Sequence, residues 1–129
     1  MYKYGKSSQR RFDTLDPKLQ LLLHVVLLKW DHSVLCGHRT EAEQDKAVAD
    51  GASKVQFPNS KHNSLPSKAV DIQQYPYNGD VKGLYMFIGY VRRVADELGI
   101  KIRCGADWDG DGSTKDQTFH DVFHVEVVE

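Results

Sequence analysis

Two segments of the chain carry apolar side chains at the three- and four-residue spacing of an amphipathic helix. In the first, residues 17–30, these positions are Leu19, Leu22, Leu23, Val26, Leu27 and Trp30. In the second, residues 81–98, they are Leu84, Phe87, Ile88, Val91, Val94, Ala95 and Leu98. Asp16 before Pro17 favours a helix start, as does Asp80, and Gly99 favours a helix end. The pattern predicts two helices that pack into the core.

Shorter apolar segments predict strands. They cover residues 33–38, 69–73, 100–104 and 122–128. Thr40 followed by Glu43 has the form of a capping box, which predicts a third helix over residues 41–51. Between these elements, polar and glycine-rich segments predict loops, and residues 1–12 are expected to be a polar arm.

The order of these elements favours an α+β fold. The late strands follow one another through a loop and not through helices, so we expect a small, mainly antiparallel sheet packed with helices. A chain of 129 residues has the length of one compact domain. We therefore expect residues 1–129 to form a single domain.

Composition excludes several classes of protein. A hydrophobic fraction of 40% and a charged fraction of 27% are typical of a soluble globular domain. A net charge of −1 provides no general attraction to nucleic acid or acidic lipid, and no segment has the ~18 apolar residues of a membrane span. Cys36 and Cys104 lack the paired spacing of a structural zinc site, so two buried thiols are expected.

Three polar residues, far apart in the sequence, have the side chains that commonly hold a catalytic zinc ion. They are His62, Asp71 and His124. Two imidazoles and one carboxylate leave a fourth position for water, and Asp121 is a candidate to accept the proton of that water. The spacing alone fits polar loop residues and a half-exposed strand histidine equally well.

The sequences around these residues follow an order that resembles one family. They are Gly37-His38-Arg39-Thr40 with Gln44, Ser60-Lys61-His62, Ala69-Val70-Asp71, Gly105-Ala106-Asp107-Trp108 and Asp121-Val122-Phe123-His124. Together they resemble the zinc peptidases of the D-Ala-D-Ala carboxypeptidase type, which share a core with the hedgehog amino-terminal domain. The resemblance covers roughly residues 15–126 and is strongest to the phage endolysin branch, the L-alanyl-D-glutamate endopeptidases.

The first half of the site follows from one family pattern, Ser-x-His-x-x-Gly-x-Ala-x-Asp. It is similar to residues 60–71, which implies that His62 and Asp71 are zinc ligands and that Ser60 supports them. This chain has two additional residues in the segment, and Ser67 stands at the position of the glycine. The departure falls in a loop and affects its conformation more than the identity of the ligands.

The second half follows from the pattern Glu/Asp-x-x-His. It implies that Asp121 is the general base and His124 the third ligand; residues three apart on one strand face opposite ways, so Asp121 is expected in the turn before the strand. Arg39 resembles the family's oxyanion-stabilising arginine, with pairing to a nearby carboxylate as the alternative. Glu126 either orients His124 or is an exposed edge carboxylate. His120 would lie ~13 Å from His124 along a strand and is expected to face solvent or to lie at the mouth of the cleft.

Residues 107–112 match the first half of an EF-hand calcium loop. The candidate ligands are Asp107, Asp109 and Asp111, with Asp116 as the nearest later carboxylate. Clustered aspartates repel one another, and a cation would relieve that repulsion. The alternatives are a solvated acidic turn and, for Asp107, a place in the substrate cleft. We favour calcium as a second cofactor beside zinc.

The resemblance implies a zinc-dependent endolysin that hydrolyses peptidoglycan stem peptides, between L-alanine and D-glutamate, with a metal-activated water. The alternatives are a D-Ala-D-Ala carboxypeptidase or dipeptidase, and a non-catalytic hedgehog-like metal-binding domain. The first residues lack the pattern of a signal peptide, so we expect the enzyme to accumulate in the host bacterial cytoplasm and to reach the wall through a membrane pore. We expect a monomer whose partners are stem peptides, not nucleic acid or membrane.

Overall fold

The computed structural model describes residues 2–115, 117 and 120–128. The α-helices in this part of the chain are α1 (Lys6–Phe12), α2 (Pro17–Leu27), α3 (Glu41–Ala49) and α4 (Val81–Leu98). The strands are β1 (His32–Cys36), β2 (Ala69–Gln74), β3 (Ile102–Cys104) and β4 (His124–Val127), and a short 3-10 turn, η1 (Lys61–Asn63), precedes β2. Each predicted helix and strand is present, with ends that differ by a few residues.

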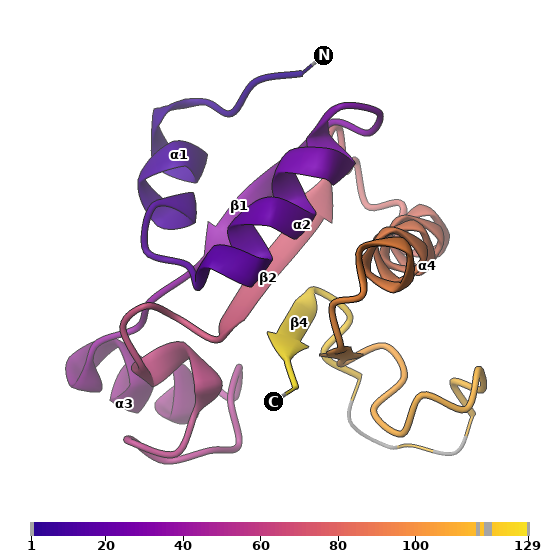
Figure 1. Cartoon of the computed structure of the whole chain (residues 1–129). Coiled ribbons are helices and arrows are strands. Elements are labelled where there is room, and N and C mark those ends of the chain that lie inside the picture. The colour runs from indigo at the N-terminus through magenta and orange to yellow at the C-terminus, as the bar shows by residue number, and fades with distance from the viewer. Residues whose placement is uncertain (1, 116, 118–119, 129) are drawn as a thin grey trace.

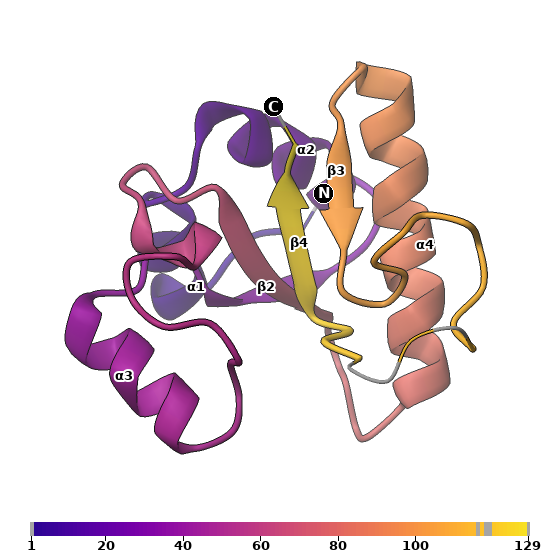
Figure 2. The ribbon, with the colours of Figure 1, turned by 90° about the horizontal axis from the view of Figure 1, so that it is seen from below.

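The four strands form one sheet in the order β1-β2-β4-β3, and every neighbouring pair is antiparallel (Figures 1 and 2). The prediction of an α+β fold with a small antiparallel sheet is therefore confirmed. The last strand, β4, begins at His124, two residues later than predicted, because a turn occupies the residues before it.

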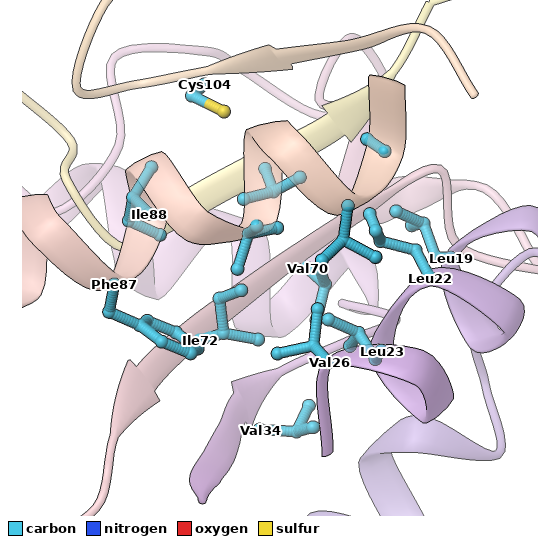
Figure 3. Close-up of a cluster of buried hydrophobic side chains, with 14 of the residues drawn as sticks. Leu19, Leu22, Leu23, Val26, Val34, Val70, Ile72, Phe87, Ile88 and Cys104 are labelled. Atoms are coloured by element: carbon cyan, nitrogen blue, oxygen red, sulfur yellow. The ribbon is translucent and has the colours of Figure 1, made fainter. Parts of the chain in front are cut away.

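The apolar faces of α2 and α4 pack against each other, and α4 also contacts β2 and β3. The core beneath them contains Val70 and Ile72 from β2 and Phe87 from α4, all fully buried (Figure 3). The predicted inner positions of both helices are buried with two exceptions. Trp30 follows the end of α2 and is partly buried, and Leu98 lies exposed at the end of α4. None of the helices within the described residues combines the length and apolar character needed to cross a membrane.

The polar arm predicted over residues 1–12 is wrong, because residues 6–12 form helix α1 beside β1 (Figure 1). The strand β1 is at the edge of the sheet, and polar side chains of α1 form hydrogen bonds with its backbone. Ser8 Oγ accepts a hydrogen bond from the Val34 amide at 3.0 Å, and Arg11 Nη1 donates to the Val34 carbonyl at 3.1 Å. A helix thus takes the place of a further strand and covers the sheet edge.

Candidate functional site

Strands β2 and β4 bring two of the three predicted ligands, Asp71 and His124, together. Their register places Asp71 opposite His124. Because side chains alternate along a strand, Val70 and Val125 face the core while Asp71 and His124 face the other side of the sheet. The site therefore lies on the face of the sheet that α2 and α4 do not cover.

The turn η1 brings His62 to the same face. Ser60 caps this turn, since its Oγ accepts from the His62 amide at 3.2 Å and its own amide donates to Asn63 Oδ1 at 3.0 Å. The His62 imidazole donates from Nδ1 to the Gly37 carbonyl at 2.8 Å. Its Nε2 consequently points toward Asp71. Ser60 contacts His62 through the backbone and not through the imidazole.

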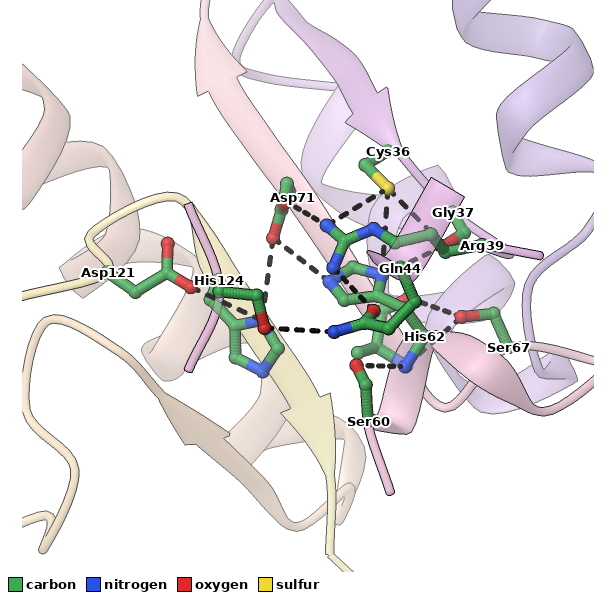
Figure 4. A network of polar contacts seen from close by, with 12 residues as sticks. Cys36, Gly37, Arg39, Gln44, Ser60, His62, Ser67, Asp71, Asp121 and His124 are labelled. Carbon is green, nitrogen blue, oxygen red and sulfur yellow. Dashed lines mark hydrogen bonds and ion pairs between the residues drawn. The ribbon is translucent and has the colours of Figure 1, made fainter. Parts of the chain in front are cut away.

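Asp71 lies between the two imidazoles (Figure 4). Its carboxylate offers an oxygen within 4.8 Å of donor atoms of Cys36 and His62, and also within 4.8 Å of donor atoms of Asp121 and His124. Asp71 Oδ1 lies 3.3 Å from His62 Nε2 and 3.4 Å from His124 Nδ1, and the two imidazole centroids are 5.2 Å apart. His62 Nε2 and Asp71 Oδ1 are buried and have no hydrogen-bond partner within the described chain. These two atoms are available to a ligand that the polypeptide does not supply.

Glu126 lies behind His124 and is buried, so the alternative of an exposed edge carboxylate is wrong. His124 Nε2 donates to Glu126 Oε1 at 2.8 Å. Arg103 Nη2 approaches the other oxygen of Glu126 at 3.5 Å. With Nε2 engaged in this way, His124 presents Nδ1 to the cluster.

Asp121 and Arg39 flank the cluster. Asp121 lies in the turn before β4, as expected, where its carbonyl accepts from the His124 amide, and its Oδ2 is 3.8 Å from His124 Nδ1. Arg39 Nη2 is 3.7 Å from Asp71 Oδ2. The arginine therefore both faces the cluster and pairs with a carboxylate. His120 is exposed, as predicted, and its Nδ1 contacts the Tyr85 hydroxyl.

Charges within the cluster shift its pKa values in the metal-free protein. Burial opposes ionisation of Asp71, His62 and His124, but their mutual attraction outweighs it. The pKa of Asp71 is lowered, that of His62 is raised to about 10, and that of His124 is also raised. Burial and the charge of Asp71 raise the pKa of Asp121. Protons thus supply the positive charge that a bound cation would replace.

Cys36 is a site residue that sequence reasoning missed. Both cysteines were expected to be buried thiols, which holds for Cys104, but Cys36 is half-buried. Its Sγ lies 3.8 Å from His62 Nδ1 and 3.6 Å from Arg39 Nη2. Cys36 pairs with Asp71 across β1 and β2, and this register has no local signal in the sequence.

A cleft of about 620 Å³ opens over the cluster. One wall contains residues 51–55 and 59–62, which follow α3. The other wall contains side chains from the segments around β3 and β4, among them Arg103, Trp108, His120 and Phe123. Asp71, Asp121 and His124 line the same cleft, so a ligand in it would touch the cluster.

The acidic loop after β3 gathers a second set of carboxylates. Asp107, Asp109 and Asp111 each offer an oxygen within 4.8 Å of the others. Asp107 is buried, and its Oδ2 accepts from the Gly112 amide at 2.8 Å and from Arg92 at 3.1 Å. Its Oδ1 has no hydrogen-bond partner in the described residues. Asp116 lies outside the described residues, and Asp107 is not among the side chains that line the cleft.

Comparison with known proteins decides the family. The model of the phage L-alanyl-D-glutamate peptidase family matches residues 1–128. The chain belongs to this family. It is 31% identical to the L-alanyl-D-glutamate peptidase of Escherichia phage T5, over 98% of each chain. The fold is similar to that of the L-Ala D-Glu endopeptidase ChiX of Serratia marcescens, with a TM-score of 0.76, 24% identity, and coverage of 98% of this chain and 90% of that chain.

Membership confirms the resemblance drawn from the ordered motifs. The chain is an enzyme of the phage L-alanyl-D-glutamate peptidase family, and the alternative of a non-catalytic hedgehog-like domain is set aside. The family match spans the cluster of His62, Asp71 and His124, the flanking Asp121, and the cleft above them.

Proposed function

We propose that the chain is a zinc-dependent peptidoglycan peptidase that hydrolyses stem peptides between L-alanine and D-glutamate. The observation that carries the proposal is the buried pair His62 Nε2 and Asp71 Oδ1 beside His124 Nδ1, atoms that attract one another but of which the first two have no hydrogen-bond partner among the described residues. Unpartnered buried polar atoms are costly, and two imidazole nitrogens with a carboxylate oxygen match the donor set of catalytic zinc. The scissile bond is the one for which the family is named.

The hydrogen bonds around both imidazoles suit metal binding. The Gly37 carbonyl accepts a hydrogen bond from Nδ1 of His62, and the Glu126 carboxylate accepts one from Nε2 of His124. Each neutral ring therefore offers an unprotonated nitrogen to the cluster, in an orientation that its partner maintains. Zinc bound there would polarise the substrate carbonyl and lower the pKa of a water molecule toward ~7.

The chain's own residues supply proton transfer and charge stabilisation. Asp121 would accept the proton of the attacking water and deliver it to the leaving amine. In the metal-free protein, burial and the charge of Asp71 raise the pKa of Asp121, which favours proton acceptance. Arg39 lies beside Asp71 and lines the cleft, where it would stabilise the oxyanion that develops on the substrate carbonyl.

The role of Asp121 is tested by Asp121→Asn. We expect kcat for peptidoglycan hydrolysis to fall by at least about 100-fold, because the general base is lost, while the zinc content is unchanged. Asp45→Asn, at an exposed position of α3, is the matched control and should keep full activity. Near-normal hydrolysis by the Asp121 variant would refute the assignment.

The scissile bond is tested by identifying the ends created in purified peptidoglycan. New amino termini on D-glutamate are expected. Release of free D-alanine without such termini would instead support the D-Ala-D-Ala carboxypeptidase alternative. The same digest with the protein stripped of metal is the control, and it should release neither product.

We propose that the enzyme acts as an endolysin. A phage enzyme is made inside the host, and its substrate lies outside the cell membrane, so accumulation in the cytoplasm must be followed by release through a pore. We expect the enzyme to act as a monomer, because one chain supplies the whole cluster and both walls of the cleft. Lysis by the purified enzyme only after the membrane is permeabilised would support this sequence of events.

The acidic loop is proposed to bind calcium. The support is the unpartnered Oδ1 of buried Asp107 beside the oxygens of Asp109 and Asp111, since calcium prefers several oxygen ligands. Calcium added to chelated, zinc-restored protein should raise the melting temperature, because it binds the folded state. Asp109→Asn with Asp111→Asn should abolish this rise, whereas Asp45→Asn should preserve it. An unchanged melting temperature in the wild type would refute the site.

A further inference from the structure

Gln44 is a fully buried polar side chain next to the cleft. A buried amide is tolerated only when its hydrogen-bonding groups find partners. Oε1 accepts from Arg39 Nη1 at 2.9 Å and from Asn63 Nδ2 at 3.3 Å. Nε2 donates to Ser53 Oγ at 3.0 Å and to the Val55 carbonyl. All four hydrogen-bonding positions of the amide are used.

These four partners come from three separate parts of the site. Ser53 and Val55 belong to the segment after α3 that lines one wall of the cleft. Asn63 belongs to η1, the turn that carries His62. Arg39 belongs to the segment between β1 and α3. One side chain therefore joins the cleft wall, the turn with a proposed ligand, and the cation beside Asp71. Figure 4 shows Gln44 beside Arg39.

The contacts of Arg39 show what Gln44 contributes to it. Nη2 lies 3.7 Å from Asp71 Oδ2, which is too far for a strong hydrogen bond, and it donates to Cys36 Sγ at 3.6 Å, where sulfur is a weak acceptor. The 2.9 Å bond from Nη1 to Gln44 is the short one. A guanidinium is planar, so fixing one nitrogen of the fork restricts the direction of the other.

We propose that Gln44 is a positioning residue that holds the Arg39 guanidinium against the cluster and couples it to the wall of the cleft. The proposal rests on the role of Arg39 in the proposed function. A ligand that presses on the wall at Ser53 and Val55 would act on the hydrogen bonds that orient Arg39. Catalytic positioning of this kind matters because small misplacements of a charged group greatly reduce the rate.

A double-mutant cycle on peptidoglycan hydrolysis tests this coupling. Gln44→Met keeps the length of the side chain but removes its hydrogen bonds, and Arg39→Met removes the cation. We expect Gln44→Met to lower kcat about tenfold in the wild type and by less than about twofold in the Arg39→Met background. Equal fold-changes in both backgrounds would show that Gln44 only stabilises the fold and would overturn the proposal.

Two further variants keep the test valid if Gln44→Met folds poorly. Gln44→Glu retains an acceptor for Arg39 and loses the donors to the cleft wall, so it should recover only the part of kcat that depends on the bond to Arg39. Ser53→Ala removes one partner of Gln44 Nε2 without touching Arg39, and it should lower kcat only when Arg39 is present. Failure of Gln44→Glu to recover kcat, or an equal effect of Ser53→Ala in both backgrounds, would contradict the coupling.

A measurement without turnover provides an independent readout. In the metal-free protein, the heteronuclear NOE of Arg39 Nε should fall in Gln44→Met and stay unchanged in Asp45→Asn. An unchanged value in Gln44→Met would overturn the proposal. An inactive wild type would count against the proposed function, whereas an active wild type with an additive cycle would count against Gln44 alone.

Discussion

At the scale of single residues, the site is defined by which nitrogen of each imidazole is free. Gly37 occupies Nδ1 of His62, and Glu126 occupies Nε2 of His124. The two rings therefore use different nitrogens toward Asp71, although both are the same amino acid. Hydrogen-bond partners set this choice, as they commonly do for histidine ligands.

The raised pKa values of His62 and His124 predict how zinc binding depends on pH. The pKa of His62 in the metal-free protein is raised from 6.5 to about 10. The protonated imidazole therefore stabilises the metal-free folded protein fully below about pH 6.5, and this stabilisation is lost as the pH rises toward about 10. Zinc requires the neutral ring. The apparent affinity of the protein for zinc should therefore rise between about pH 6.5 and 10, by roughly tenfold per pH unit for each proton that zinc displaces. Competition titrations with a chelator between pH 6 and 9 measure it.

A pH-independent affinity would contradict the assignment of the imidazoles as ligands. His24, exposed on α2, offers a matched control. The variant His24→Gln should keep the pH dependence of the wild type, whereas His62→Gln should weaken zinc binding at every pH.

At the scale of elements, the site depends on how closely the segment after β3 approaches the turn before β4. The Gly105 amide donates to the His124 carbonyl at 2.9 Å. A Cβ at Gly105 would lie 2.0 Å from the Asp121 carbonyl oxygen, far inside contact distance. Only glycine allows this approach, and the turn that carries Asp121 is placed by it.

We therefore expect Gly105→Ala to displace Asp121. The steric clash should cost roughly 1–3 kcal/mol of unfolding free energy and reduce kcat more than stability alone explains. Gly89→Ala is the control, because a Cβ there meets nothing within 4 Å and the position lies within α4, where alanine is favoured. Melting curves and hydrolysis rates measure both effects, and full activity in Gly105→Ala would contradict this account.

At the scale of the whole molecule, the sheet separates the core from the chemistry. Its covered face packs against α2 and α4, and its other face carries Asp71, His124 and Glu126. A metal ion in the cluster would connect η1 to β2 and β4. The two strands are already paired in the sheet and packed into the core, whereas η1 is held beside them by hydrogen bonds such as that from His62 to Gly37. Metal binding should then stabilise the fold and not only activate it.

Removal of zinc tests this statement. At a zinc concentration about 100 times Kd, binding adds about 2.7 kcal/mol, which corresponds to a rise in melting temperature on the order of 10 °C for a domain of this size. Chelation should lower the melting temperature by that amount. In calcium-free buffer, the variant His62→Ala should melt at the same temperature with and without chelator, and a zinc-dependent shift in that variant would place the metal elsewhere.

The sequence predicted the elements whose signals are local. The start of α2 at Asp16 and Pro17 and the end of α4 at Gly99 were found because caps and apolar periodicity act within a few residues. The helix α1 was missed because its polar side chains serve β1. Their partner, Val34, lies more than twenty residues away and gives no signal near residues 6–12.

By itself, the sequence determined the helices and strands other than α1, the family, and the residue types that the cluster would use. The tertiary structure alone decided that β2 pairs with β4 so that Asp71 meets His124, that Cys36 lies at the site, which partners Gln44 binds, and which imidazole nitrogens are free. The physical reason is range. Periodicity and capping act between neighbours along the chain, whereas strand register and hydrogen-bond partners arise only when distant segments pack together.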